Sequence, residues 1–275
     1  MTTLTTVPCR PVHIGAAGWL ALHAAAFWAQ GAWAARRLLD GSDDPLGIAA
    51  LIALAAWLLR AAPTLRVQPR IAWLAASGAL TVAATAAWLL APPLPAAMLA
   101  ALALAAHIAA WLPQGVARAP LAGLVLLALP LVASLQFYLG YPLRVFTAEF
   151  SAWLLQAAGQ AAERSGAAMT VNGQWVIVDA PCSGVQMAWL GYFAACAVAA
   201  FVGLRDGRFL RRLPLVGLIV LMGNVLRNTL LVGLEARPQG LSAAWHEAIG
   251  LAMLVIVIVL TVRVMSPQTR RGVPA

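Results

Sequence analysis

Three reactive side chains, Cys182, Arg227 and His246, lie near the ends of long apolar segments in the second half of the chain. Cys182 follows Pro181 at the start of a predicted helix, where the positive end of the helix dipole favours the thiolate that attacks carbonyl carbons. A histidine can accept the thiol proton and later protonate a leaving amine, while an arginine can stabilise a thiolate or the oxyanion of a tetrahedral intermediate. Together these residue types indicate acyl transfer.

Arg227 has polar neighbours although it lies inside an apolar segment, where an arginine at a helix centre costs about 2.5–3.5 kcal/mol. Asn224, Arg227 and Asn228 share one helical face, because they lie three and four residues apart. An arginine that only reaches toward the membrane surface needs no amides beside it. The pattern favours a functional site, and an arginine satisfied by amides and backbone groups within a bundle is the structural alternative.

The sequence predicts no metal and no cofactor. One cysteine and one histidine do not complete a tetrahedral zinc site, and the chain contains no His-Glu-x-x-His motif and no phosphate-binding glycine-rich loop. The remaining cysteines and histidines are interpreted as packing or tail residues: Cys9, Cys196, His13, His23 and His107.

The composition requires a membrane environment. Of 275 residues, 63% are apolar and 10% are charged, against roughly 45–50% and about 25% in soluble domains. Three cysteines build no disulfide framework, and the net charge of +9 is interpreted as membrane topology, with no nucleic-acid partner. We predict an all-α polytopic membrane protein with about eight transmembrane helices, at approximately 13–35, 46–62, 70–91, 94–112, 119–139, 183–203, 213–234 and 241–263.

The arginines predict the orientation of these spans. With both termini in the cytoplasm, inner segments hold twelve of the 18 basic residues and outer segments hold five, as the positive-inside rule requires, although Arg36 and Arg37 are a local violation. Cys182 then begins the sixth span at the outer face. Arg227 lies about 10 Å and His246 roughly 8 Å below the same face, at 1.5 Å per residue. The three reactive side chains should therefore meet at one level of the outer leaflet.

A segment before Cys182 is predicted to fold on the outer side. Residues 143–160 have the spacing of an amphipathic interfacial helix, and residues 168–178 indicate a β-hairpin that turns at Asn172-Gly173. We therefore divide the chain into an N-terminal transmembrane bundle of about five spans (1–139), an outer helix with a hairpin (140–182), a three-span catalytic part (183–263) and a cytoplasmic tail (264–275).

Residues from about 135 to 263 resemble the exosortase/archaeosortase family of membrane transpeptidases. The resemblance is carried by an ordered set of motifs: Tyr141-Pro142-Leu143-Arg144, Pro181-Cys182-Ser183-Gly184-Val185, Asn224-x-x-Arg227 and His246-x-x-x-Gly250. Two positions depart from the usual pattern, namely Pro181, where alanine is more usual, and Gln186. They leave open the subfamily and the signal that it reads.

The resemblance implies a cysteine enzyme that recognises a C-terminal sorting signal, consisting of a short motif such as Pro-Glu-Pro, a transmembrane helix and a basic tail. It implies Cys182 as the nucleophile, with Arg227 and His246 completing the site; the supporting residues are Ser183, Gly184, Asn224, Asn228 and Arg144. The implied partners are membrane-anchored protein substrates, the lipid bilayer and a glycan or lipid acceptor. The absence of lysine and the abundance of alanine, leucine and arginine suggest a bacterial inner membrane.

Two other classes of function fit parts of the pattern. A transporter could use Arg227 to bind an anion, but such proteins distribute polar residues through the depth of the bundle and often contain repeats with broken helices. A membrane enzyme that acts on lipid-linked glycans would use an arginine and a histidine at the outer face without needing Cys182. The reactivity of the Cys182 thiol separates both alternatives from a cysteine enzyme.

Overall fold

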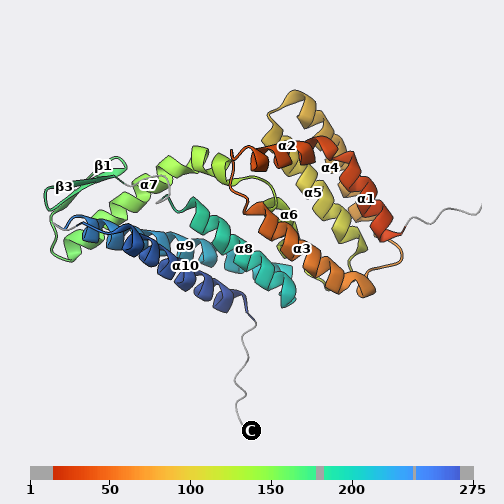
Figure 1. The fold of residues 1–275 in the computed structure, drawn as a ribbon. Helices are drawn as coiled ribbons and strands as arrows, with labels where there is room; N and C mark the ends of the chain where they lie inside the picture. Colours follow the sequence, from red (N-terminus) through yellow and green to blue (C-terminus); the bar gives the residue numbers. More distant parts are fainter. Residues whose placement is uncertain (1–14, 178–182, 238–239, 267–275) are drawn as a thin grey trace, which may run out of the picture.

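The computed structural model describes residues 15–177, 183–237 and 240–266. Within them the chain is mostly helical, with one small sheet (Figure 1). The helices and strands are α1 (Ala16–Ala26), α2 (Trp28–Leu39), α3 (Gly47–Ala61), η1 (Ala62–Thr64), α4 (Ile71–Leu90), α5 (Pro93–Trp111), α6 (Ala119–Leu127), α7 (Val132–Ala157), β1 (Ala162–Ser165), β2 (Ala168–Val171), β3 (Gln174–Ile177), α8 (Val185–Phe201), α9 (Asp206–Glu235) and α10 (Ala243–Met265).

The helices form two groups (Figure 1). One group contains α1, α2, α4 and α5, the other contains α7 to α10 with the sheet, and α3 and α6 lie between them. Five helical segments among the described residues are long and apolar enough to cross a membrane: α3 with η1, α4, α5, α9 and α10. A sixth is possible if α6 and α7 count as one bent span. A multi-pass membrane protein is confirmed, whereas the predicted number of eight spans is not.

Three of the predicted spans differ from single membrane-crossing helices. The segment predicted at 183–203 is α8, an apolar helix of 17 residues that is shorter than a typical span. The segment predicted at 13–35 consists of α1 and α2, which separate at Phe27, where ψ is 25°. The segment predicted at 119–139 bends by 95° between α6 and α7, at a break that contains Pro130. Proline lacks the N–H that helix continuation requires, which accounts for the break.

Helix α7 continues past the predicted end of the fifth span. We predicted a span at 119–139 and a separate interfacial helix over 143–160, and this division is wrong, because α7 runs through Pro142 as far as Ala157. A single proline removes one backbone donor from the helix, and the later turns of α7 gain contacts with α9. The predicted interfacial helix is therefore the second half of a longer helix, and the border drawn between residues 139 and 140 falls within it.

The predicted hairpin is confirmed, and it belongs to a three-stranded antiparallel sheet. Val171 pairs with Gln174, and the turn residues Asn172 and Gly173 have φ values of 51° and 81°. Positive φ at both central residues matches the Asn-Gly turn that favours hairpins. Strand β1, of sequence Ala-Glu-Arg-Ser, was not predicted; three of its four residues are exposed, and it exists by pairing with β2.

Helices α8, α9 and α10 approach one another closely at glycines. A Cβ atom added at Gly191 of α8 would lie 2.5 Å from a methyl of Val220 on α9, and one added at Gly223 of α9 would lie 2.3 Å from a methyl of Val257 on α10. Small residues allow membrane helices to approach in this way. These three helices therefore form a closely packed unit that fixes the positions of the side chains near the start of α8, the end of α9 and the start of α10.

Candidate active site

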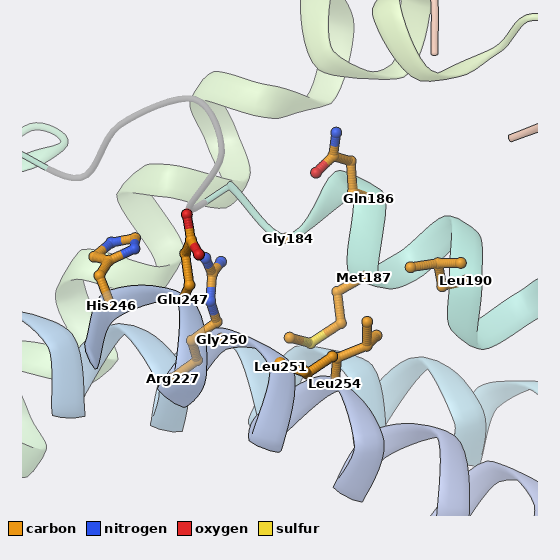
Figure 2. Close-up of a pocket in the computed structure, with 10 residues that line it drawn as sticks. All are labelled: Gly184, Gln186, Met187, Leu190, Arg227, His246, Glu247, Gly250, Leu251 and Leu254. Atoms are coloured by element: carbon orange, nitrogen blue, oxygen red, sulfur yellow. The ribbon is translucent and has the colours of Figure 1, made fainter. Parts of the chain in front are cut away.

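Arg227, His246 and Gly184 line one cavity of about 320 Å³ between α8 and α10 (Figure 2). Arg227 comes from α9, His246 from the first turn of α10, and Gly184 immediately precedes α8. The structure thus brings together, from α9 and α10, two of the three side chains that were predicted to lie at one level; the third, Cys182, lies outside the described residues. The other lining residues are Gln186, Met187, Leu190, Glu247, Gly250, Leu251 and Leu254.

Gly250 leaves the space that the Arg227 side chain occupies. A Cβ atom added at Gly250 would lie 3.3 Å from Nε and 3.4 Å from Nη2 of Arg227, so any side chain there would press on the guanidinium. Gly250 lies one turn beyond His246 on α10. The spacing His246-x-x-x-Gly250 therefore places the histidine and the room for the arginine on one face of a helix.

Gly184 is required both by its backbone conformation and by its surroundings. Its φ of +85° is in the region that glycine adopts without strain, and an added Cβ atom would lie 2.7 Å from Cγ of Asn224. The amide of Asn224 thus packs directly against the backbone that leads into α8. This contact links the residue after Ser183 to the same helix that carries Arg227.

Two buried amides of α9 bond to two buried hydroxyls of α7. Asn224 Nδ2 donates to Thr147 Oγ1 and Asn228 Nδ2 donates to Ser151 Oγ, both at 3.0 Å, and all four residues are buried. Ser151 Oγ donates in turn to the carbonyl of Val225 at 3.3 Å. We call these four residues the amide ladder. It fixes the rotation and depth of α9 against α7 and, with them, the place from which Arg227 projects.

Ser183 and Gln186 connect the start of α8 to other elements. Ser183 Oγ donates to Gln136 Oε1 of α7 at 2.7 Å and accepts the Val185 N–H at 3.3 Å, so Ser183 has the capping contact expected near a helix start. Gln186 Nε2 donates to Asp44 Oδ2 at 2.8 Å. In the same loop, hydrogen bonds from the side chain and backbone of Ser42 lower the pKa of the Asp40 carboxyl.

A second cavity, of about 270 Å³, lies beside the same segment. Gln186 lines both cavities, Gly184 lines the first and Ser183 lines the second. The segment from Ser183 to Gln186 therefore has a cavity on each side of it. The remaining residues of the second cavity come from the loop before α3 and from the start of α7: Gly41, Ser42, Asp43, Asp44, Val132, Ala133 and Gln136.

Four of the described residues that were predicted for the site do not line the first cavity, namely Ser183, Asn224, Asn228 and Arg144. Cys182 and Pro181 lie outside the described residues. Arg144 Nε donates to the Gly140 carbonyl at 3.4 Å, and its guanidinium lies 5.8 Å from the centre of the Tyr141 ring. Arg144 is not among the residues that line the cavity.

Glu247, Thr147 and Ser151 were not predicted as site residues from the sequence. Glu247 adjoins His246 and lines the cavity (Figure 2). The contact of Thr147 and Ser151 with α9 could have been predicted from their spacing, because they are four residues apart, as are Asn224 and Asn228. Two polar pairs with the same helical spacing can form two successive bonds between neighbouring helices.

The other cysteine and histidines that the structure describes lie elsewhere. Cys196 is buried within α8. His23 and His107 stack on each other in the N-terminal group, with ring centres 4.6 Å apart. Within the described residues, no three His, Cys, Asp or Glu side chains are grouped so that they could hold a metal ion.

The fold and the cavity define a multi-pass helical membrane protein with an arginine and a histidine at a shared site. The family model described as transmembrane exosortase (Exosortase_EpsH) matches residues 16–263. The chain belongs to this family, a transpeptidase and cysteine protease family that is associated with the processing of sorting signals. The predicted resemblance is confirmed and extends to the first helices. Neither the search of curated proteins nor that of solved structures returned a match.

Proposed function

We propose that the protein is a cysteine transpeptidase that cleaves a C-terminal sorting signal at the outer face of the bacterial inner membrane. Its substrates are membrane-anchored proteins that end in a short motif such as Pro-Glu-Pro, a transmembrane helix and a basic tail. Residues 183–263 form the catalytic part, the segment 140–182 lies on the periplasmic side, and the tail 264–275 is cytoplasmic. The acceptor is an amine or hydroxyl of a glycan or lipid.

One observation carries this proposal. Arg227, His246 and Gly184 line a single cavity, and Cys182 precedes Gly184 by two residues in the sequence. Two residues of extended chain span at most about 7 Å. This short separation supports the proposal that the Cys182 thiol, the His246 imidazole and the Arg227 guanidinium act on one peptide bond, as acyl transfer through a cysteine requires.

The proposed reaction has two steps. The Cys182 thiolate attacks the carbonyl carbon of the scissile peptide bond, Arg227 stabilises the oxyanion, and His246 protonates the leaving amine as the C–N bond breaks. This step gives a thioester and releases the C-terminal helix. The acceptor then attacks the thioester carbonyl and loses its proton to His246, and the Cys182 thiolate leaves. The product carries the acceptor through a new amide or ester bond.

The test uses a secreted reporter that ends in a Pro-Glu-Pro motif, an apolar helix and an arginine-rich tail, co-expressed with the full-length protein. We expect wild type to shorten the reporter, and Cys182→Ala and Cys182→Ser to abolish shortening while both variants accumulate in the membrane. Cys196→Ala is the matched control and should process normally, because Cys196 is buried in α8 away from the cavity. Normal processing by both Cys182 variants would contradict the nucleophile assignment.

Thiol labelling separates the proposal from a transporter or a glycan-processing enzyme. A membrane-impermeant maleimide, added to intact spheroplasts at several pH values, should modify Cys182 rapidly, with a rate that rises as the thiolate fraction rises. Cys182→Ser provides the blank. An unreactive Cys182 together with an unshortened reporter would favour the two other classes.

A further inference from the structure

We propose that the apolar end of the cavity between α8 and α10 is the docking site for the first turns of the substrate's transmembrane helix. The inference rests on the proposed function and goes further by assigning the groove that holds the membrane part of the substrate. The docking site is defined by Met187 and Leu190 of α8 and by Leu251 and Leu254 of α10. The cleaved bond then lies at the polar end, beside Arg227 and His246.

The cavity changes from polar to apolar along α10. His246 and Glu247 lie in the first turns of the helix, Gly250 follows, and Leu251 and Leu254 complete the stripe. From His246 to Leu254 the helix rises about 12 Å, at 1.5 Å per residue. Figure 2 shows the leucine side chains of α10 and Met187 of α8 on the same side of the cavity, away from His246.

Helix α8 has the same order of residue types. Gln186 stands at the outer end of α8, and Met187 and Leu190 follow within the next turn. Two helices that run in the same direction therefore present a polar start and an apolar continuation to one groove. A polypeptide that leaves the aqueous phase and enters the membrane as a helix has the same order of polarity.

The groove is closed at its inner end. A Cβ atom added at Gly191 would lie 4.0 Å from a methyl of Val257 on α10 and 2.5 Å from a methyl of Val220 on α9. The three helices thus come together at Gly191, the residue after Leu190, and at Val257, about one turn beyond Leu254. The groove accommodates only the beginning of an apolar helix, and the rest of that helix would continue along the side of α10 that carries Leu251 and Val255, which are 63% and 52% exposed, and not along the side that carries Ile256.

The charges at the polar end favour a peptide over a phospholipid. Arg227 attracts an anionic headgroup, but the Glu247 carboxylate lines the same cavity and repels one. A peptide backbone has no net charge and offers both donors and acceptors, so it suits a rim that contains a guanidinium, a carboxylate, an imidazole and the amide of Gln186.

Disulfide trapping in membranes tests the docking site without needing catalysis. The Cys182→Ala background carries Leu254→Cys in one protein and Ile256→Cys in another, and the reporter carries a single cysteine moved through the first two turns of its apolar helix. Ile256 is the matched control, because it lies on the same helix and is 49% exposed but does not line the cavity. We expect oxidation to link the reporter to Leu254→Cys, with maxima every three or four positions, and not to Ile256→Cys.

A gain-of-bulk variant provides the second readout. Leu254→Trp, in the otherwise wild-type chain, should fill the groove and reduce reporter processing at least tenfold, while Ile256→Trp processes normally. Links at Ile256→Cys equal to those at Leu254→Cys, with intact wild-type processing, would overturn the docking site and leave the proposed function standing. Absence of processing by wild type would instead contradict the proposed function. A phospholipid that co-purifies with wild type and is lost in Leu254→Trp, without any reporter links, would assign the groove to lipid.

Discussion

The pair α4 and α5 and the unit α8, α9 and α10 both consist of apolar helices, but the helices are packed against one another in different ways. In α4, a Cβ atom added at Gly78 would meet nothing within 4 Å, and the partner helix α5 is packed mainly through buried alanines. In the C-terminal unit, a Cβ atom added at Gly191, Gly223 or Gly250 would lie 3.3 Å or less from an atom of a neighbouring helix. Alanine packing holds two helices together, whereas glycine contacts also fix where particular side chains lie.

The two regions also differ in the hydrogen bonds between their helices. Ser77 Oγ of α4 donates to the Ala103 carbonyl of α5 at 3.0 Å, and this is a bond from a side chain to a backbone group. The amide ladder joins α7 and α9 through two bonds between side chains. Bonds between side chains depend on both residue identities, so the ladder determines the register of α9 more strictly than Ser77 determines that of α4.

The largest expected effect is that of Gly184→Ala. An alanine at this position would have to adopt a φ of +85° and would place its Cβ atom 2.7 Å from Cγ of Asn224. Backbone strain and overpacking would each lower the stability of the folded state by about 1–3 kcal/mol. We expect loss of detectable reporter processing and a lower melting temperature in detergent. Gly78→Ala in α4 is the control and should leave both measurements unchanged. If Gly184→Ala and Gly78→Ala had the same processing and the same melting temperature, the proposed difference in packing between the two regions would be wrong.

Gly250→Leu comes next, because it acts on a single side chain. The leucine would displace the Arg227 guanidinium, whose Nε lies 3.3 Å from the ideal Cβ position. We expect processing to fall about 10²-fold, the size of effect seen when one oxyanion donor is lost, while the protein still accumulates in the membrane. The processing rate of Gly250→Ala should lie between those of wild type and Gly250→Leu, because the flexible arginine side chain can move by a few tenths of an ångström to accommodate a methyl group. Full activity of Gly250→Leu would show that the position of Arg227 is not critical.

The sequence predicted those elements whose cause is local. The Asn172-Gly173 turn defines the hairpin, and long apolar runs define α4, α5 and α10. Features that depend on distant contacts were missed. Strand β1 exists by pairing with β2, and α7 continues through Pro142, so neither is encoded in a short window of residues.

The residues of the candidate site also fall into those that were predicted from the sequence and those that were not. Arg227 and His246 were found from their cost inside apolar segments and from motif spacing, and the structure places both on one cavity. Glu247 was not predicted as a site residue, because carboxylates are common at helix starts, where they interact favourably with the helix dipole. The ladder hydroxyls Thr147 and Ser151 were not predicted as site residues, because residues 143–160 were predicted to form an interfacial helix separate from the transmembrane helices to which they bond.

The smallest expected effects are on the thermal stability of two serine variants, Ser77→Ala and Ser151→Ala. Each of these serines donates a hydrogen bond to a carbonyl of a neighbouring helix. Ser77→Ala removes one bond to the Ala103 carbonyl, and because hydrogen bonds between membrane helices average about 0.6 kcal/mol, the melting temperature in detergent should barely change. Ser151→Ala removes the bond to the Val225 carbonyl and also takes the Oγ acceptor from the buried Asn228 amide. A buried donor that loses its acceptor costs about 1–3 kcal/mol.

Both variants are compared by thermal unfolding in the same detergent, together with Asn228→Ala and the double variant Asn228→Ala/Ser151→Ala. We expect Ser151→Ala to be the more destabilising of the two serine variants. The double variant should be less destabilising than the sum of its single changes, because removing both partners leaves no amide without its hydroxyl. If Ser77→Ala and Ser151→Ala were equally destabilising and the effects in the double variant were additive, the amide ladder would stabilise the fold no more than the single bond between α4 and α5 does. The register of α9, and with it the place of Arg227, would then have to come from the glycine contacts alone.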